Sequence, residues 1–138
     1  MMCVIVIESA ADGVDPQWNS NAPACRSTRS GDLVAPPHSQ ASIAVSINDS
    51  NWTAPNASPD LRQQIGQKLS LQPSGGLRTV PIAAVVLTGG AIAGMLTLHK
   101  CQPFTLLATP HVHAVLDANP VFEFLNRIIV SRPTLRAA

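Results

Sequence analysis

Residues 79–98, TVPIAAVVLTGGAIAGMLTL, are twenty consecutive residues without a charge. A helix needs about 20 mostly apolar residues to cross a bilayer, so one interpretation is a single membrane-spanning helix. The other is a buried strand, a glycine turn and the start of a helix inside an α/β protein. The rest of the chain must be interpreted differently in the two cases.

The order of residues within this stretch favours the strand. An apolar, β-rich run over residues 82–87 follows Pro81 and stops at Gly89 and Gly90. A run of this length closed by glycines is typical of a strand buried on both faces. Two adjacent glycines would weaken the middle of a helix by roughly 1 kcal/mol each. We therefore predict a strand over residues 81–87 and a short helix over 91–99.

Composition narrows the class of protein. The chain has 138 residues, enough for one domain with a core, and only 12% of them are charged. A net charge of +1 without a basic cluster gives no case for nucleic-acid binding. The three cysteines are widely spaced, which predicts neither a disulfide framework nor a CxxC metal site. The first residues lack the basic region and the length of a signal peptide, so we expect a cytoplasmic protein.

Strands and helices alternate along the chain, which predicts an α/β layered domain. Ser58, Pro59 and Asp60 predict a helix start, with Leu61, Ile65 and Leu69 as its apolar stripe. Residues 9–40 form a long polar loop in which Trp18 is the one large apolar anchor. The remaining predicted elements are strands at 3–7, 42–47, 52–56 and 104–107 and helices that begin at Thr109-Pro110 and Asn119-Pro120, the last one reaching Ile129.

Few residues suggest chemistry by themselves. His111 and His113 follow a helix start, where side chains two apart diverge by about 200° and share a metal poorly. His38 and His99 stand alone, and the interval between Asp12 and Asp15 is too common to indicate a cation site. The turn after Thr88 lacks the glycine pattern of a phosphate loop.

Several short sequence segments along the chain nevertheless form a pattern. They are PQWN at 16–19, SIAVS at 42–46, NASPDLRQQI at 56–65, LQP at 71–73, GLR at 76–78, PIAAVVLT at 81–88, CQP at 101–103 and ATP-x-VH at 108–113. In order and spacing these segments resemble the pyrroloquinoline quinone (PQQ) biosynthesis protein B family of the metallo-β-lactamase-like superfamily. The resemblance covers the N-terminal half of that family.

The resemblance implies a fold and a function. The fold would be a partial αββα sandwich, the first sheet with its flanking helices, over residues 1–130, with a C-terminal tail at 131–138. The function would be a part in PQQ biosynthesis, by iron-dependent hydroxylation of the precursor or by transport of PQQ or its precursor to the periplasm. Family members hold iron or zinc.

The chain departs from the family where the metal should bind. The family's loop after the strand carries two aspartates and a histidine, but Gly89 and Ala93 stand at the aspartate positions and the histidine has no counterpart. Glycine and alanine side chains offer no ligand atoms. Of the family's cysteine cluster, suited to a structural zinc, only Cys25 remains. We therefore expect no catalytic residue, no metal and no cofactor here, with Asp60 and His113 as weak candidates.

Three hypotheses follow. The first is a protein of PQQ biosynthesis that has lost its metal chemistry and takes PQQ or its peptide-derived precursor as partner. The second is a truncated, non-catalytic fragment, because family members are about twice as long and the first sheet alone would expose an apolar face able to self-associate. The third is the single-pass membrane protein spanning residues 79–98.

Overall fold

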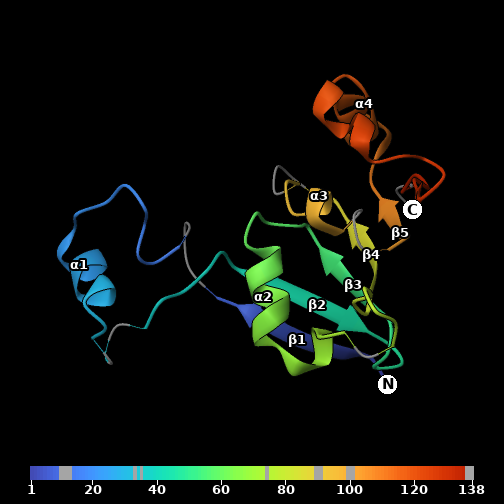
Figure 1. Ribbon diagram of the computed structural model, residues 1–138. Helices are drawn as coiled ribbons and strands as arrows, with labels where there is room; N and C mark the ends of the chain where they lie inside the picture. The colour runs from blue at the N-terminus through green and yellow to red at the C-terminus, as the bar shows by residue number, and fades with distance from the viewer. Residues whose placement is uncertain are drawn as a thin grey trace.

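The computed structural model describes residues 1–9, 14–32, 34, 36–73, 75–88, 92–98 and 102–135. Its described strands form one sheet in the order β1-β2-β3-β4-β5-β6. β1 to β3 are antiparallel neighbours, whereas β3 to β6 run parallel (Figure 1). The strands are β1 (Cys3–Glu8), β2 (Ser42–Ser46), β3 (Trp52–Pro55), β4 (Ile82–Val86), β5 (Phe104–Leu107) and β6 (Val130–Ser131). The α/β class predicted from the sequence is confirmed.

The helices α2 and α3 pack on one face of this sheet. In Figure 1, α2 lies in front of β1 and β2, and α3 lies beside the end of β4. Apolar side chains of these helices join strand residues such as Trp52 and Leu106 in one buried core. The helices are α1 (Pro23–Arg29), α2 (Leu61–Gln67), α3 (Met95–Leu98) and α4 (Pro110–Asp117), with 3-10 turns η1 (Leu69–Leu71) and η2 (Pro120–Phe124).

The uncharged stretch at 79–98 forms a strand and a short helix rather than one long helix. β4 lies inside the sheet between β3 and β5, and α3 follows after the loop. The predicted helix over 91–99 is shorter than expected, and residues 91 and 99 lie outside the described part of the chain. Among the described residues, no helix has the length and apolar character needed to span a bilayer.

β4 was expected to be buried on both faces, and this prediction is wrong. Ile82 and Val85 are fully buried, but Ala83 is exposed and Val86 only half-buried. The reason is that α2 and α3 pack on one face of the sheet, while β4 side chains on the other face stay exposed or half-buried.

The helix after β3 begins later than predicted. Asp60, not Ser58, is the residue before the first turn of α2, and the carbonyl of Ser58 accepts a hydrogen bond from Leu61 N over 3.1 Å. The predicted stripe also fails at Leu69, which is 86% exposed. Lys68 is extended and ends the helix, so the chain turns and buries Leu71 instead.

The last predicted helix is also wrong. Asn119 does cap a turn, because its side chain accepts a hydrogen bond from Val121 N, but the turn is the short η2. The chain then reaches the sheet as β6, which leaves Ile128 92% exposed. The division of the chain at residue 130 stays a prediction. β6 spans this position, and a bridge from Ala108 to Thr134 lies beyond it.

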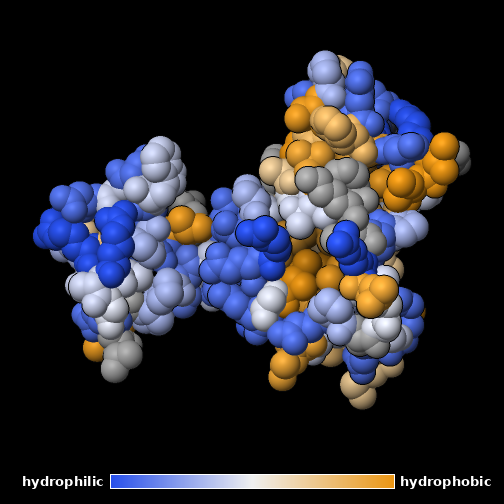
Figure 2. Space-filling view, viewed as in Figure 1, coloured by the Kyte–Doolittle hydropathy of each residue, from blue (hydrophilic) through white to orange (hydrophobic). Residues whose placement is uncertain are grey.

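The long polar loop contains a helix that sequence patterns did not predict. α1 and its flanking segments form a lobe apart from the sheet, and the visible surface of this lobe is mostly hydrophilic (Figures 1 and 2). Paired backbone hydrogen bonds between Asp15 and His38, of 2.8 and 2.7 Å, close its base. Trp18 is 88% exposed, so the prediction that it anchors the loop is wrong. Arg29 holds the loop instead, donating to the carbonyls of Gln17 and Ser20.

Candidate functional site

The carboxyl ends of the strands meet at one edge of the sheet. β3, β4 and β5 run parallel, so the residues after Pro55, Val86 and Leu107 lie together there. β1 runs in the same direction as β3, which places Glu8 at this edge as well. In open parallel sheets this edge is where ligands commonly bind. It is also where the sequence places the family's metal loop.

An amide–hydroxyl pair joins the first residues of two loops at this edge. Asn56 Nδ2 donates to Thr88 Oγ1 over 2.9 Å, and Asn56 Oδ1 accepts from Thr88 N over 2.9 Å. Asn56 N also donates to the carbonyl of Val86 over 2.7 Å. Asn56 has a φ of 65°, a left-handed conformation that asparagine tolerates better than most residues. The donor and acceptor atoms of this pair are therefore directed at each other.

α3 packs closely against the loop after β3. Gly94 N donates to the carbonyl of Ala57 over 2.9 Å, and a side chain at Gly94 would place a Cβ only 2.2 Å from the carbonyl oxygen of Ser58. Only glycine allows this approach. The neighbouring Ala93 is exposed at the same turn, with a methyl group as its side chain.

The described residues that follow β3 and β4 do not fit a metal ion that needs carboxylate and imidazole ligands. Gly89 lies outside the described residues, and by its chemistry it offers only backbone atoms. Among the described residues, no group of three His, Cys, Asp or Glu side chains is placed to hold a metal. His99 and Cys101 lie outside the described residues. The loss of metal ligands at Gly89 and Ala93 stays a prediction.

A second polar cluster lies where the lobe meets this edge. His38 Nδ1 is 3.1 Å from Glu8 Oε1, so His38 has a carboxylate partner that the sequence did not indicate. A hydrogen bond from Ser9 N, followed by the contact with His38, lowers the pKa of Glu8. The partners are thirty residues apart, and no local spacing could have revealed them.

Cys25, the remnant of the family's zinc cluster, is buried in the lobe. Its Sγ is 3.5 Å from Asp15 Oδ1, and Thr28 Oγ1 donates to Asp15 Oδ2 over 2.7 Å. Asp15 therefore bridges the base of the lobe and α1. Asp12, its predicted companion, lies outside the described residues.

The two weak candidates make structural contacts. An oxygen of Asp60, Oδ2, accepts a hydrogen bond from Gln40 N over 3.2 Å, which ties α2 to the strand connection before β2. His113 Nε2 lies 3.2 Å from the carbonyl oxygen of Pro133. His111 is on the exposed side of the same helix, α4. The structure does not bring Asp60 and His113 into one group of ligands among the described residues.

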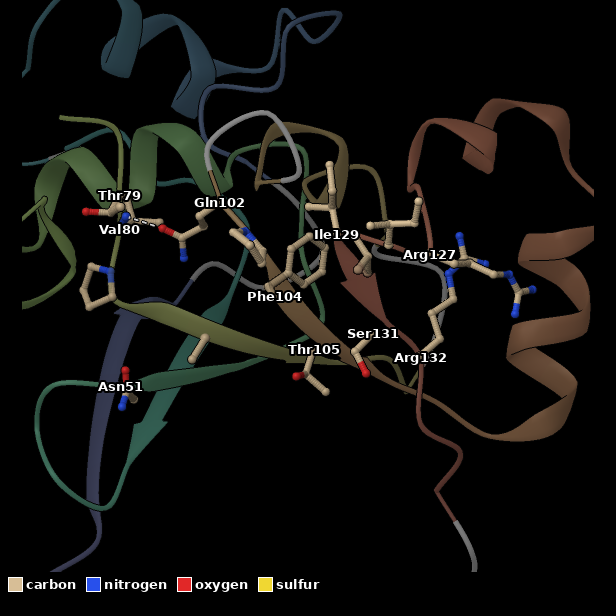
Figure 3. A pocket seen from close by; sticks show the side chains of 15 residues that line it. Asn51, Thr79, Val80, Gln102, Phe104, Thr105, Arg127, Ile129, Ser131 and Arg132 are labelled. Carbon is tan, nitrogen blue, oxygen red and sulfur yellow. Dashed lines mark hydrogen bonds between the residues drawn. The ribbon is translucent and has the colours of Figure 1, made fainter. Parts of the chain in front are cut away.

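A large hollow lies at the amino ends of the parallel strands, opposite the carboxyl edge. It has a volume of about 740 Å³ and is drawn in Figure 3. Gln102 is one of the residues that line the hollow. Its side chain accepts a hydrogen bond from Val80 N over 2.6 Å and donates one to the carbonyl of Ile82 over 2.7 Å. Arg127 and Arg132 at its rim both bond to Asp117. Among the described residues that line it, none carries a carboxylate, imidazole, thiol or amine that could serve as an acid or base.

Comparison with known proteins identifies the superfamily. A family model described as "Beta-lactamase superfamily domain" matches residues 51–137. The chain belongs to the beta-lactamase superfamily. A crystal structure of Zn²⁺-bound PqqB from Methylobacterium extorquens superimposes with a TM-score of 0.90 at 44% identity, covering 99% of this chain and 50% of that one. A diphosphatase of the PhnP family superimposes with a TM-score of 0.71 at 19% identity, which supports the fold alone.

The sequence relatives agree with this placement. Coenzyme PQQ synthesis protein B from Gluconacetobacter diazotrophicus is 58% identical over 98% of this chain and 45% of its own length. The protein of the same name from Methylorubrum extorquens strain PA1 is 44% identical over 97% of this chain and 46% of its own. The chain thus spans about half the length of these curated relatives. The resemblance to the PQQ synthesis protein B family predicted from the sequence is confirmed.

Proposed function

We propose that this chain acts in PQQ biosynthesis as a PqqB-like protein that contributes no metal chemistry of its own. The observation that supports the proposal is the set of residues at the carboxyl edge of β3 and β4. There the Asn56–Thr88 pair joins the first residues of two loops, and the sequence has Gly89 and Ala93 where the family resemblance implies carboxylates. The proposal therefore rests on the residue types of this loop, which include no carboxylate or imidazole from residue 88 to residue 96.

The pathway assignment is supported by the relatives, whose printed name is coenzyme PQQ synthesis protein B. What this chain can retain without metal ligands is binding of PQQ or of its peptide-derived precursor. Hydroxylation of the precursor needs a metal-bound reaction centre, so it would require ligands that the described residues of this edge do not offer. Binding in support of synthesis or transport is therefore the role that we assign.

Two measurements on the same purified chain test the proposal. Equilibrium dialysis against PQQ is expected to show saturable binding, and metal analysis after anaerobic reconstitution with Fe²⁺ or Zn²⁺ is expected to show far less than one ion per chain. A double variant, Gly89→Asp with Ala93→Asp, returns both carboxylates and is expected to retain more metal than the parent chain.

PqqB from M. extorquens, which crystallised with Zn²⁺, is the positive control for metal retention. Absence of binding to both PQQ and its precursor would contradict the pathway role. A parent chain that holds about one ion would contradict the loss of metal chemistry, whatever the result of the dialysis.

A further inference from the structure

The lobe formed by α1 and its flanking segments has the side chain of Asp15 at its centre. Thr28 Oγ1 lies 2.7 Å from Asp15 Oδ2, and Cys25 Sγ lies 3.5 Å from Asp15 Oδ1. Thr28 and Cys25 are three residues apart on α1 and both are buried, so they lie on the same side of the helix. Each carboxylate oxygen of Asp15 therefore accepts a hydrogen bond from α1.

The hydroxyl of Thr28 has one proton and two acceptors within reach. The carbonyl oxygen of Ala24 lies 3.1 Å from Thr28 Oγ1, which is farther than Asp15 Oδ2. Hydrogen bonds to an ionised acceptor are shorter and roughly twice as strong as those between neutral groups. The proton of Thr28 is therefore directed to Asp15.

The backbone of Asp15 closes the base of the lobe. Its N–H and C=O groups exchange hydrogen bonds of 2.8 and 2.7 Å with the backbone of His38. The side chain of His38 in turn lies 3.1 Å from Glu8, at the end of β1. Asp15 thus holds α1 through its carboxylate and, through its backbone, joins the two chain segments that connect the lobe with the sheet.

The family resemblance implies a structural zinc in this lobe, and the described residues do not fit one. A structural zinc ion takes four ligands, chiefly cysteine and histidine side chains. Cys25 and Asp15 are two potential ligands that meet, but no third His, Cys, Asp or Glu side chain joins them among the residues that the structure describes. Both oxygens of Asp15 are already hydrogen-bonded.

We propose that Asp15 closes the lobe by hydrogen bonds in place of a metal ion. Arg29 supports this closure by donating to the carbonyls of Gln17 and Ser20, which holds the segment before α1 against the helix. A chelator cannot remove such contacts, whereas loss of the Asp15 carboxylate or of the Thr28 hydroxyl would. The closure involves a part of the chain outside the carboxyl edge, so it holds whether or not the chain binds PQQ.

Alkylation of Cys25 measures how often the lobe opens, because this thiol is only 6% exposed in the closed lobe. Iodoacetamide is added to the full chain, and the reaction rate at each cysteine is followed by peptide mass mapping. Cys3, on β1, is the internal reference for opening of the sheet. We expect Cys25 of the parent chain to react at the same slow rate with and without EDTA.

Two variants remove the hydrogen bonds of Asp15 in different ways. Asp15→Asn replaces one acceptor oxygen with a donor group, and Thr28→Val removes the hydroxyl donor with little change in shape. Each is expected to raise the alkylation rate at Cys25 about tenfold or more, while the rate at Cys3 stays that of the parent. Asp32→Asn is the matched control, because it makes the same chemical change at an exposed aspartate of the lobe and should leave both rates unchanged.

Three results would overturn the proposal. An unchanged rate at Cys25 in both variants would show that Asp15 does not close the lobe. Equal increases at Cys25 and Cys3 in both variants would show that the chain opens as a whole and not at the lobe. Faster alkylation of Cys25 in the parent chain on addition of EDTA would show that a metal ion holds the lobe closed.

Discussion

The helix-covered face of the sheet and the carboxyl edge of its parallel strands are built on different requirements. The covered face requires apolar side chains of suitable volume. Trp52, Ile82 and Leu106 are such side chains, and all three are buried there. The edge needs particular ligand atoms, and there Ala93 and the Asn56–Thr88 pair supply none that would hold a metal. The chain therefore shares the fold of its relatives closely, and we expect the chemistry of its site to differ.

The covered face is expected to give the largest effect on stability. Leu106→Ala removes a fully buried side chain and leaves a cavity, at a cost of about 2–5 kcal/mol in the free energy of unfolding. Urea denaturation measures this change. Leu77→Ala, at a fully exposed leucine, is the control and is expected to change stability by less than about 0.5 kcal/mol. Similar losses in the two variants would show that the core does not sustain the fold.

The backbone of the edge is the next test. Gly94→Ala would press a methyl group against the carbonyl of Ser58, so we expect a loss of about 1–3 kcal/mol. Gly66→Ala, in α2, meets nothing within 4 Å and is expected to gain up to about 1 kcal/mol. Thermal unfolding compares the two. A neutral Gly94→Ala would mean that α3 does not need its close approach to the loop after β3.

The Asn56–Thr88 pair should contribute less. Asn56→Ala removes three hydrogen bonds with Thr88 and disfavours the left-handed backbone, with an expected cost of about 1–2 kcal/mol. Asn56→Gly loses the same hydrogen bonds but accepts the backbone conformation, so it should cost less than the alanine variant. Equal effects in chemical denaturation would assign the whole contribution to the hydrogen bonds. If neither variant changes the free energy of unfolding, the Asn56–Thr88 pair does not stabilise the edge.

The smallest expected effect is a pH dependence from Glu8. Its pKa in the folded chain lies below the ordinary value of 4.5, chiefly through the hydrogen bond from Ser9 N and then through His38. A lowered folded pKa means stabilisation above the unfolded pKa that is lost as pH falls. The melting temperature of Glu8→Gln should therefore fall less steeply than that of the parent below pH 4.5. Parallel profiles would contradict this assignment.

Local patterns in the sequence predicted much of the fold, because strands and N-caps depend on neighbouring residues. The first five strands and the start of α4 at Thr109 follow directly from such patterns. The failures came where distant parts of the chain decide. Leu69 fits the helical period, yet the chain leaves the helix at Lys68 and buries Leu71. β6 pairs with β5 at the edge of the sheet, where the sequence predicted a continuing helix.

The candidate site was less predictable than the fold. The absence of side-chain ligands at Gly89 and Ala93 can be stated from the sequence because it depends only on residue types. The pairing of His38 with Glu8, and of Asp15 with Cys25 and Thr28, depends on how the lobe closes on the sheet. No spacing along the chain contains that information.

The metal content of the purified chain tests the central claim most directly. After reconstitution with Fe²⁺ or Zn²⁺ and removal of unbound ions, elemental analysis should find far less than one ion per chain, with PqqB from M. extorquens retaining its metal in parallel. A parent chain that retains about one ion, with affinity comparable to that control, would contradict the account of the carboxyl edge.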